Sequence, residues 1–221
     1  LKRLFKALET KKEDRLKLDP YYHQNYPYLS KFPNVNGGMF RDQDIIIPPF
    51  TPKLKNILLD HASRGFDWSD ISPTIFGAVF ESTLNPETRR AGGMHYTSIE
   101  NIHKVIDPLF LDDLKAELEQ IKQYKNKKTI EEKAIAFQEK LSNLTFFDPA
   151  CGSGNFLTET FLSLRRLENE AIRLRTGGES LLDVGQADDW IKVSIQQFYG
   201  IEINDFAVSV AKTALWIAED Q

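Results

Sequence analysis

Two groups of residues in this sequence have the types and spacing to bind a small molecule. The first is the run Asp-Pro-Ala-Cys-Gly-Ser-Gly-Asn-Phe at residues 148–156, directly after the β-type run Leu-Thr-Phe-Phe. Gly152 and Gly154 allow a sharp turn and a close approach of the backbone to a ligand. Asp148 places a carboxylate at the tip of the expected strand, where open α/β sheets bind ligands. A carboxylate suits an amine-bearing or cationic ligand and conflicts with a bare phosphate. The alternative is a purely structural strand-to-helix turn.

The second group is centred on Glu202, at the end of the next β-type run, residues 198–203. An acidic residue in this place typically accepts hydrogen bonds from ribose hydroxyls. Glu202 lies further from the glycines than the roughly 20 residues usual in dinucleotide sites, which we attribute to a long intervening helix and the loop 176–189. A solvated strand-end carboxylate is the alternative. Together the two groups fit an adenosine with a zwitterionic tail, and S-adenosylmethionine is such a ligand.

Two other nucleotide sites fit the glycine run poorly. It is not a P-loop, because no Gly-Lys-Ser/Thr follows. It also lacks the third glycine of a dinucleotide fingerprint, since Leu157 stands at that position. An NAD-dependent oxidoreductase is therefore a disfavoured rival.

The elements around these groups form a βαβα unit. A strand leads into the glycine turn and a helix that begins near Asn155, and a second strand ends at the acidic tip before a helix capped by Asn204. This order predicts a parallel sheet. The residues expected to face inward on the two helices are Leu157, Phe161, Leu164 and Ala171, then Ala207, Val210, Ala211, Ala214 and Leu215.

The region before the first strand is expected to be helical. Thr97-x-x-Glu100 and Thr129-x-x-Glu132 are capping-box patterns that should begin helices, and Asp107-Pro108 should end the first of these. Further upstream, Thr51-Pro52 and Ser72-Pro73 should each begin a helix, the first ending at Gly65 and the second with Ile75, Phe76, Val79 and Phe80 inward. Residues 1–18 are read as a helix and residues 19–50 as an irregular connection.

Composition sets limits on the class of protein. The chain has 221 residues, 41% hydrophobic and 27% charged, as in globular proteins. We expect no membrane span and no signal peptide, and the absence of an initial Met suggests part of a longer protein. The single cysteine fits a cytoplasmic setting. A net charge of −4 argues that any main phosphate-binding surface lies elsewhere.

The motifs resemble those of adenine-specific DNA methyltransferases. Residues 148–156 look like their motif I, Gly200-Ile-Glu-Ile-Asn204 like motif II, and Gly93-Met-His-Tyr-Thr-Ser98 like motif X. The wider context is similar to the MmeI-like group of Type IIG/IIL restriction–modification enzymes: residues 34–40 and 75–81 look like the helical segment before their methyltransferase domain.

The resemblance implies a role for each matching residue. His95, Tyr96 and Thr97 would line the methionine end of S-adenosylmethionine. Asp148, Ala150, Gly152 and Gly154 would form the turn that contacts the methionine part, while Glu202 would hold the ribose and Ile203 would pack on the adenine. The implied fold is α/β: a helical spacer region at 1–90, then an incomplete Rossmann-like methyltransferase domain at 91–221 that carries motifs X, I and II.

The family's catalytic motif, Asn/Asp-Pro-Pro-Tyr/Phe, hydrogen-bonds a flipped adenine and is expected after motif II. None occurs there in this chain, and Ile47-Pro-Pro-Phe50 has Ile in place of the polar residue, so we expect no catalytic residue here and an inactive fragment. The implied substrate is double-stranded DNA, bound mainly by other regions; the oligomeric state and any fused nuclease stay open. Rival functions are methylation of RNA or protein, and a non-catalytic scaffold in a phage-defence complex.

Two further residue types receive structural interpretations. The four histidines share no metal-ligand spacing, so no metal site is expected. Cys151 has no adjacent His or Lys and is interpreted as a small buried residue, not as a nucleophile.

Overall fold

The computed structural model describes residues 6–8, 10, 11, 14, 49–65, 72–83, 97–177 and 190–220. Its contacts divide the chain into two units, Leu1–Trp68 and Ser69–Gln221. The predicted boundary near residue 90 falls between the described residues 83 and 97, and the domain limits stay a prediction. Most of the segments expected at 1–18 and 19–50 also lie outside the described residues.

The first unit contains the helix expected after Thr51. Helix α4 (Pro52–Leu59) begins with Thr51 as its N-cap, whose hydroxyl accepts a hydrogen bond from the Leu54 amide at 3.2 Å. It continues into the π-helical turn η2 (Asp60–Arg64), and Gly65 follows as the C-cap. Proline fits the first helical position because its missing N–H would have no partner there. The start after Thr51 and the end at Gly65 were both predicted correctly.

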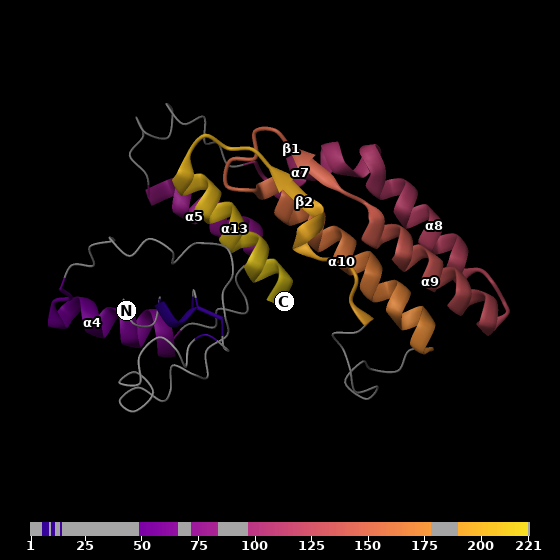
Figure 1. The fold of residues 1–221 in the computed structure, drawn as a ribbon, viewed down its shortest axis with the longest axis horizontal. Coiled ribbons are helices and arrows are strands. Elements are labelled where there is room, and N and C mark those ends of the chain that lie inside the picture. Colours follow the sequence, from indigo (N-terminus) through magenta and orange to yellow (C-terminus); the bar gives the residue numbers. More distant parts are fainter. Residues whose placement is uncertain are drawn as a thin grey trace. The chain divides into compact units, whose positions relative to one another are not determined.

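The second unit is built around the long helix α10 (Asn155–Thr176). Figure 1 shows α8 (Asp112–Lys122), α9 (Lys127–Asn143) and α10 side by side, with α5 (Pro73–Thr83) paired with α13 (Asp205–Asp220). The residues predicted to face inward on α10 and α13 are all buried. The stripe of apolar side chains at helical spacing therefore predicted the buried faces of these two helices correctly.

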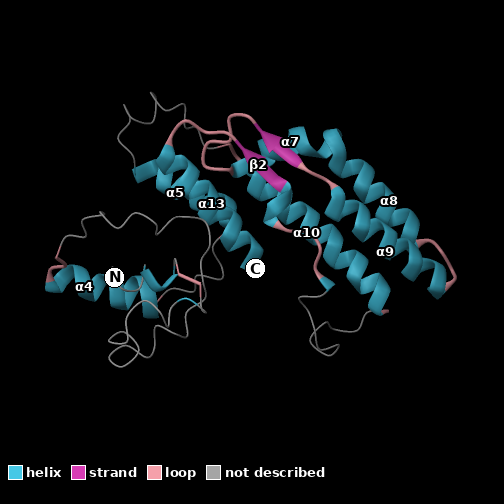
Figure 2. Cartoon of the chain, in the orientation of Figure 1, coloured by secondary structure: helices cyan, strands magenta, loops and turns pink. Residues whose placement is uncertain are grey.

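The sheet consists of two short parallel strands, β1 (Phe146–Asp148) and β2 (Phe198–Gly200), within a mostly helical unit (Figure 2). Phe146 pairs with Phe198, and their rings stack with centroids 5.2 Å apart on the side of α10. Phe147 and Tyr199, one residue on, are 61% and 55% exposed, because alternate strand residues face opposite sides. The parallel βα arrangement was predicted, and its extension to a Rossmann-like sheet stays a prediction.

A buried carboxylate fixes the segment that leads into β2. Glu168, fully buried on α10, accepts hydrogen bonds from the Gln138 side chain at 2.8 Å and from the backbone amides of Lys192 at 2.7 Å and Val193 at 3.2 Å. Because an unpaired buried amide costs about 1–3 kcal/mol, these bonds stabilise the return of the chain to the sheet.

Two helix starts and one helix end differ from the sequence prediction. Helix α7 (Ile99–Ile106) is capped by Ser98, not Thr97, and α9 is capped by Asn126, whose side chain accepts from the Lys128 and Thr129 amides. Pro108 does not end α7, because a π-helical turn, η4 (Asp107–Leu111), carries the chain into α8. The wider i→i+5 turn accommodates the proline that an α-helical turn would exclude.

The inward face predicted for α5 is also wrong in part. Ile75 and Val79 are 48% and 55% exposed, whereas Thr74 and Gly77 are buried. The helix therefore presents its small residues to its neighbours, which brings the helix axes closer than bulky side chains would allow.

Among the described residues, no helix combines the length and the apolar character that a membrane span requires.

Candidate functional site

The two strand ends and the glycine turn are joined by backbone hydrogen bonds beyond the strands themselves. The Ile201 amide donates to the Asp148 carbonyl at 3.0 Å, and the Cys151 amide donates to the Ile201 carbonyl at 3.1 Å. These two bonds hold the turn that follows β1 against Ile201, the first residue after β2. Asp148 and Glu202, both half-buried and fifty-four residues apart in sequence, flank one turn at the carboxyl edge of the sheet.

Asp148 shapes the start of the turn. Its Oδ1 accepts a hydrogen bond from the Ala150 amide at 3.0 Å, an arrangement in which an Asp side chain stabilises a tight turn two residues on. Pro149 and Ala150 are exposed, and the carboxylate itself is half-buried. One of its oxygens thus supports the turn while the group keeps contact with solvent.

The two glycines of the turn serve different purposes. Gly154 has φ +80°, and a Cβ there would lie 2.8 Å from the Cβ of Ala211, so only glycine allows α10 to begin this close to α13. Gly152 has φ +54°, and a Cβ there would meet no atom within 4 Å. Gly154 therefore packs against the fold, whereas Gly152 turns its backbone toward open space.

Glu202 binds the turn directly. Its Oε2 accepts from the Gly152 amide at 3.0 Å, and its Oε1 accepts from the Asn204 amide at 2.8 Å. An ionised carboxylate has about four acceptor sites, so two backbone bonds leave capacity for ligand hydroxyls. Ile203, beside it, is 88% exposed. The sequence did not predict the Glu202–Gly152 bond, which links the two groups of candidate residues.

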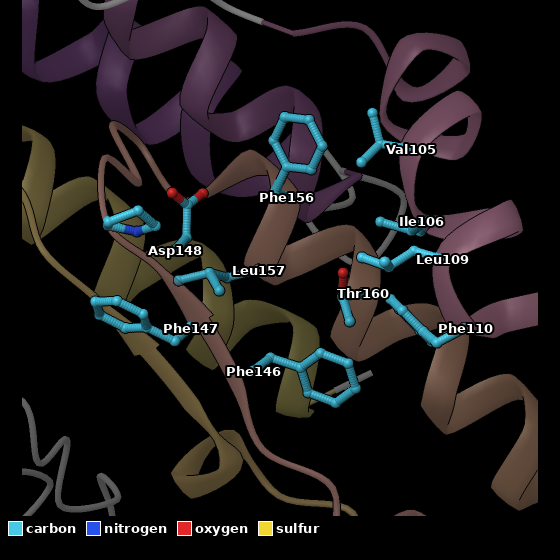
Figure 3. Close-up of a pocket in the computed structure, with 11 residues that line it drawn as sticks. Val105, Ile106, Leu109, Phe110, Phe146, Phe147, Asp148, Phe156, Leu157 and Thr160 are labelled. Atoms are coloured by element: carbon cyan, nitrogen blue, oxygen red, sulfur yellow. The ribbon is translucent and has the colours of Figure 1, made fainter.

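An apolar cavity of about 290 Å³ adjoins Asp148 on the side of α7 and η4. Figure 3 shows Phe156 and Val105 at one end, and Leu109, Phe146 and Phe147 around the rest. The sequence pattern did not predict this cavity, because Val105 and Leu109 lie outside the buried stripe of Ile102 and Ile106. In the structure both side chains are exposed, Val105 by 49% and Leu109 by 71%.

The remaining predicted site residues are placed as follows. Thr97 is half-buried just before the Ser98 cap of α7, and His95 and Tyr96 lie outside the described residues. Cys151 is half-buried in the turn; burial raises the pKa of its thiol, and the carboxylates of Asp148 and Glu202 raise this pKa further. In the described part of the chain no His, Cys, Asp or Glu cluster has the geometry for a metal ion.

The fold and site define a parallel βα unit that holds a glycine turn between two carboxylates at the carboxyl ends of its strands, the edge at which open α/β sheets bind ligands. Residues 121–221 match the family described as "MmeI, DNA-methyltransferase domain". Over 194 residues, 88% of this chain and 21% of the relative, the sequence is 40% identical to DNA methyltransferase A of Bacillus subtilis (strain 168).

Two further comparisons agree. A putative type II restriction enzyme and methyltransferase of Methanocaldococcus jannaschii is 28% identical over 249 residues, covering 95% of this chain and 20% of that protein. The solved structure of the Type IIL restriction–modification enzyme MmeI in complex with DNA matches with a TM-score of 0.73 and 43% identity, over 98% of this chain and 27% of that one.

These matches confirm the resemblance drawn from the motifs: the chain is MmeI-like, and its residues 121–221 match the MmeI DNA-methyltransferase domain. The chain spans about a fifth of the length of the curated relatives it matches.

Proposed function

We propose that this chain forms the cofactor-binding part of a DNA methyltransferase of the restriction–modification or phage-defence type, acting in the cytoplasm. The reaction would transfer a methyl group from S-adenosylmethionine to the exocyclic amino group of adenine in double-stranded DNA. The single observation that carries the proposal is the hydrogen bond between Glu202 and the Gly152 amide, which joins the two candidate groups into one site.

The residues present fit this cofactor. Gly152 faces open space, so a ligand can approach its backbone without meeting a side chain. The Asp148 carboxylate suits the methionine ammonium group. The N-cap of α10 is Gly154, which has no side chain to bond the first amides of the helix, so these amides favour the methionine carboxylate. Thr97, with His95 and Tyr96, would line the same methionine end.

The opposite end of the site would hold the adenosine. Glu202 has acceptor capacity for the ribose hydroxyls, and its bonds to the Gly152 and Asn204 amides fix the direction of its carboxylate before a ligand arrives. Ile203, 88% exposed beside it, offers an apolar surface for the adenine ring. When bound, S-adenosylmethionine supplies an electrophilic methyl group; this chain's residues bind and orient it.

The test is methyl transfer by the full protein with labelled S-adenosylmethionine and double-stranded DNA, followed by nucleoside analysis. We expect label in N6-methyladenine, and Asp148→Asn and Glu202→Gln should each raise the KM for the cofactor. Each change removes a charge-assisted hydrogen bond, worth about 1.5–3 kcal/mol, or roughly tenfold or more in KM. Label in cytosine, or no label in the DNA, would refute the assigned substrate, and an unchanged KM in both variants would refute the assigned site.

A further inference from the structure

Helix α5 lies directly against the glycine turn. A Cβ at Gly77 would lie 2.9 Å from both the Ser153 Oγ and the Asn155 Oδ1, closer than real Cβ contacts come. Ser153 and Asn155 are 2% and 6% exposed. The backbone of α5 therefore forms the wall behind the turn, and glycine at 77 is what permits this approach.

A buried hydrogen bond holds α5 in this place. The Thr74 hydroxyl, fully buried, donates to the Glu159 Oε2 at 3.0 Å, and Glu159 is 2% exposed. Thr74 precedes Gly77 by three residues and Glu159 follows Asn155 by four, so each pair lies on one helix face. The Thr74–Glu159 hydrogen bond and the close contact of Gly77 with Asn155 thus join the same face of α5 to the same face of α10.

Glu159 is itself fixed from two other directions. Its Oε1 lies 3.3 Å from the His103 Nε2 on α7 and 3.3 Å from the Arg166 guanidinium. A carboxylate buried this deeply needs such partners, because an isolated buried charge is strongly unfavourable. The Thr74 hydroxyl is therefore bound to a rigid group, not to a mobile surface side chain.

The other side of the turn is held by α13, which also packs on α5 (Figure 1). Ala211 of α13 leaves room only for a glycine at position 154, because a Cβ there would lie 2.8 Å from the Ala211 Cβ. The turn is consequently enclosed between α5 and α13 on its inner side, with Gly152 left facing open space.

We propose that Thr74, Gly77 and Glu159 are positioning residues for the cofactor-binding turn. They act on it through Ser153 and Asn155 and do not touch the cofactor. Thr74 and Gly77 precede residues 121–221, which match the methyltransferase family, so part of the cofactor site's framework lies upstream of that region. The link to the cofactor rests on the function proposed above, whereas control of the turn does not.

The experiment compares Thr74→Val with Thr74→Ser in the full protein, because valine keeps the shape and removes the hydroxyl that serine retains. Gly77→Ala tests the close contact. Two controls are Ile75→Ala, on the exposed side of α5, and Ile121→Val, which removes one buried methylene in α8. The readouts are the alkylation rate of Cys151 without ligand, which reports the turn, and the Kd for S-adenosylmethionine.

We expect Thr74→Val and Gly77→Ala to increase Cys151 alkylation. Thr74→Val should raise the Kd about tenfold, the effect of one lost hydrogen bond to a charged group, and Gly77→Ala should raise the Kd because the new Cβ displaces Ser153 and Asn155. Thr74→Ser should restore both readouts, and the controls should change neither, even where they lower the Tm. Unchanged alkylation in Thr74→Val and Gly77→Ala overturns the proposal. If the unmodified protein binds no cofactor while alkylation responds as predicted, the proposed function fails and control of the turn by α5 stands.

Discussion

Replacing Gly154 by alanine should destabilise the protein strongly, for two reasons that can be separated. The residue has φ +80°, and a left-handed conformation costs a non-glycine residue roughly 1–2 kcal/mol. The new Cβ would also lie 2.8 Å from the Ala211 Cβ and 3.1 Å from its Cα, and relief of such overpacking typically costs about 1–3 kcal/mol. We therefore expect Gly154→Ala to lower the free energy of unfolding by about 2–5 kcal/mol.

Gly152→Ala is the matched control, because Gly152 has φ +54° and open space around its missing Cβ. Only the backbone cost of about 1–2 kcal/mol should appear there. Urea denaturation gives both values, and Ala211→Gly should recover part of the loss in the Gly154→Ala background. Equal losses at the two glycines, or no recovery, would refute the reasoning that α13 limits the space at Gly154.

Three further predictions concern stability and reactivity. Asn204→Ala should lower the free energy of unfolding by about 0.5–2 kcal/mol in urea denaturation, because its side chain accepts from two amides at the start of α13; a loss below that range would mean the cap is not used. Asp148→Asn should speed alkylation of Cys151 near pH 8, since the carboxylate adds to burial in raising the thiol pKa; an unchanged or lower rate would contradict this. The hydrogen bond from His103 lowers the pKa of Asp107 below its unfolded value, so this carboxylate stabilises the fold above about pH 4 and the benefit is lost as pH falls through the folded pKa. The Tm difference between the protein and Asp107→Asn should accordingly be largest near neutral pH and shrink in acid, and a constant difference would contradict the assignment.

Local signals in the sequence were sufficient where one interaction decides the structure. Asn204 accepts from the Phe206 and Ala207 amides, and the alanines and Val210 that follow repeat at helical spacing, so the helix and its buried face were predicted correctly. The same holds for Thr51-Pro52 at α4. Where neighbours compete, the pattern was not sufficient: Thr97 and Ser98 can both cap α7, and the chain uses Ser98.

Tertiary packing decided the features that the sequence could not predict. Ile75 and Val79 look like core residues, but the close approach of Gly77 to Ser153 turns the opposite face of α5 inward. For the site, residue types identified Asp148, the glycines and Glu202 as candidates. The bond between Glu202 and the Gly152 amide depends on two strands pairing in register, a contact between residues 50 positions apart that no local pattern encodes.

Calorimetric titration of S-adenosylmethionine into the full protein, with NAD as the comparison ligand, tests the cofactor assignment most directly. We expect saturable binding of S-adenosylmethionine, no binding of NAD, and affinity reduced roughly tenfold or more in Glu202→Gln, which loses a charged acceptor at the centre of the site. Ile75→Ala, on the exposed side of α5, should bind as the unmodified protein does. Absence of S-adenosylmethionine binding by a folded protein, or equal affinity in Glu202→Gln, would contradict the cofactor assignment.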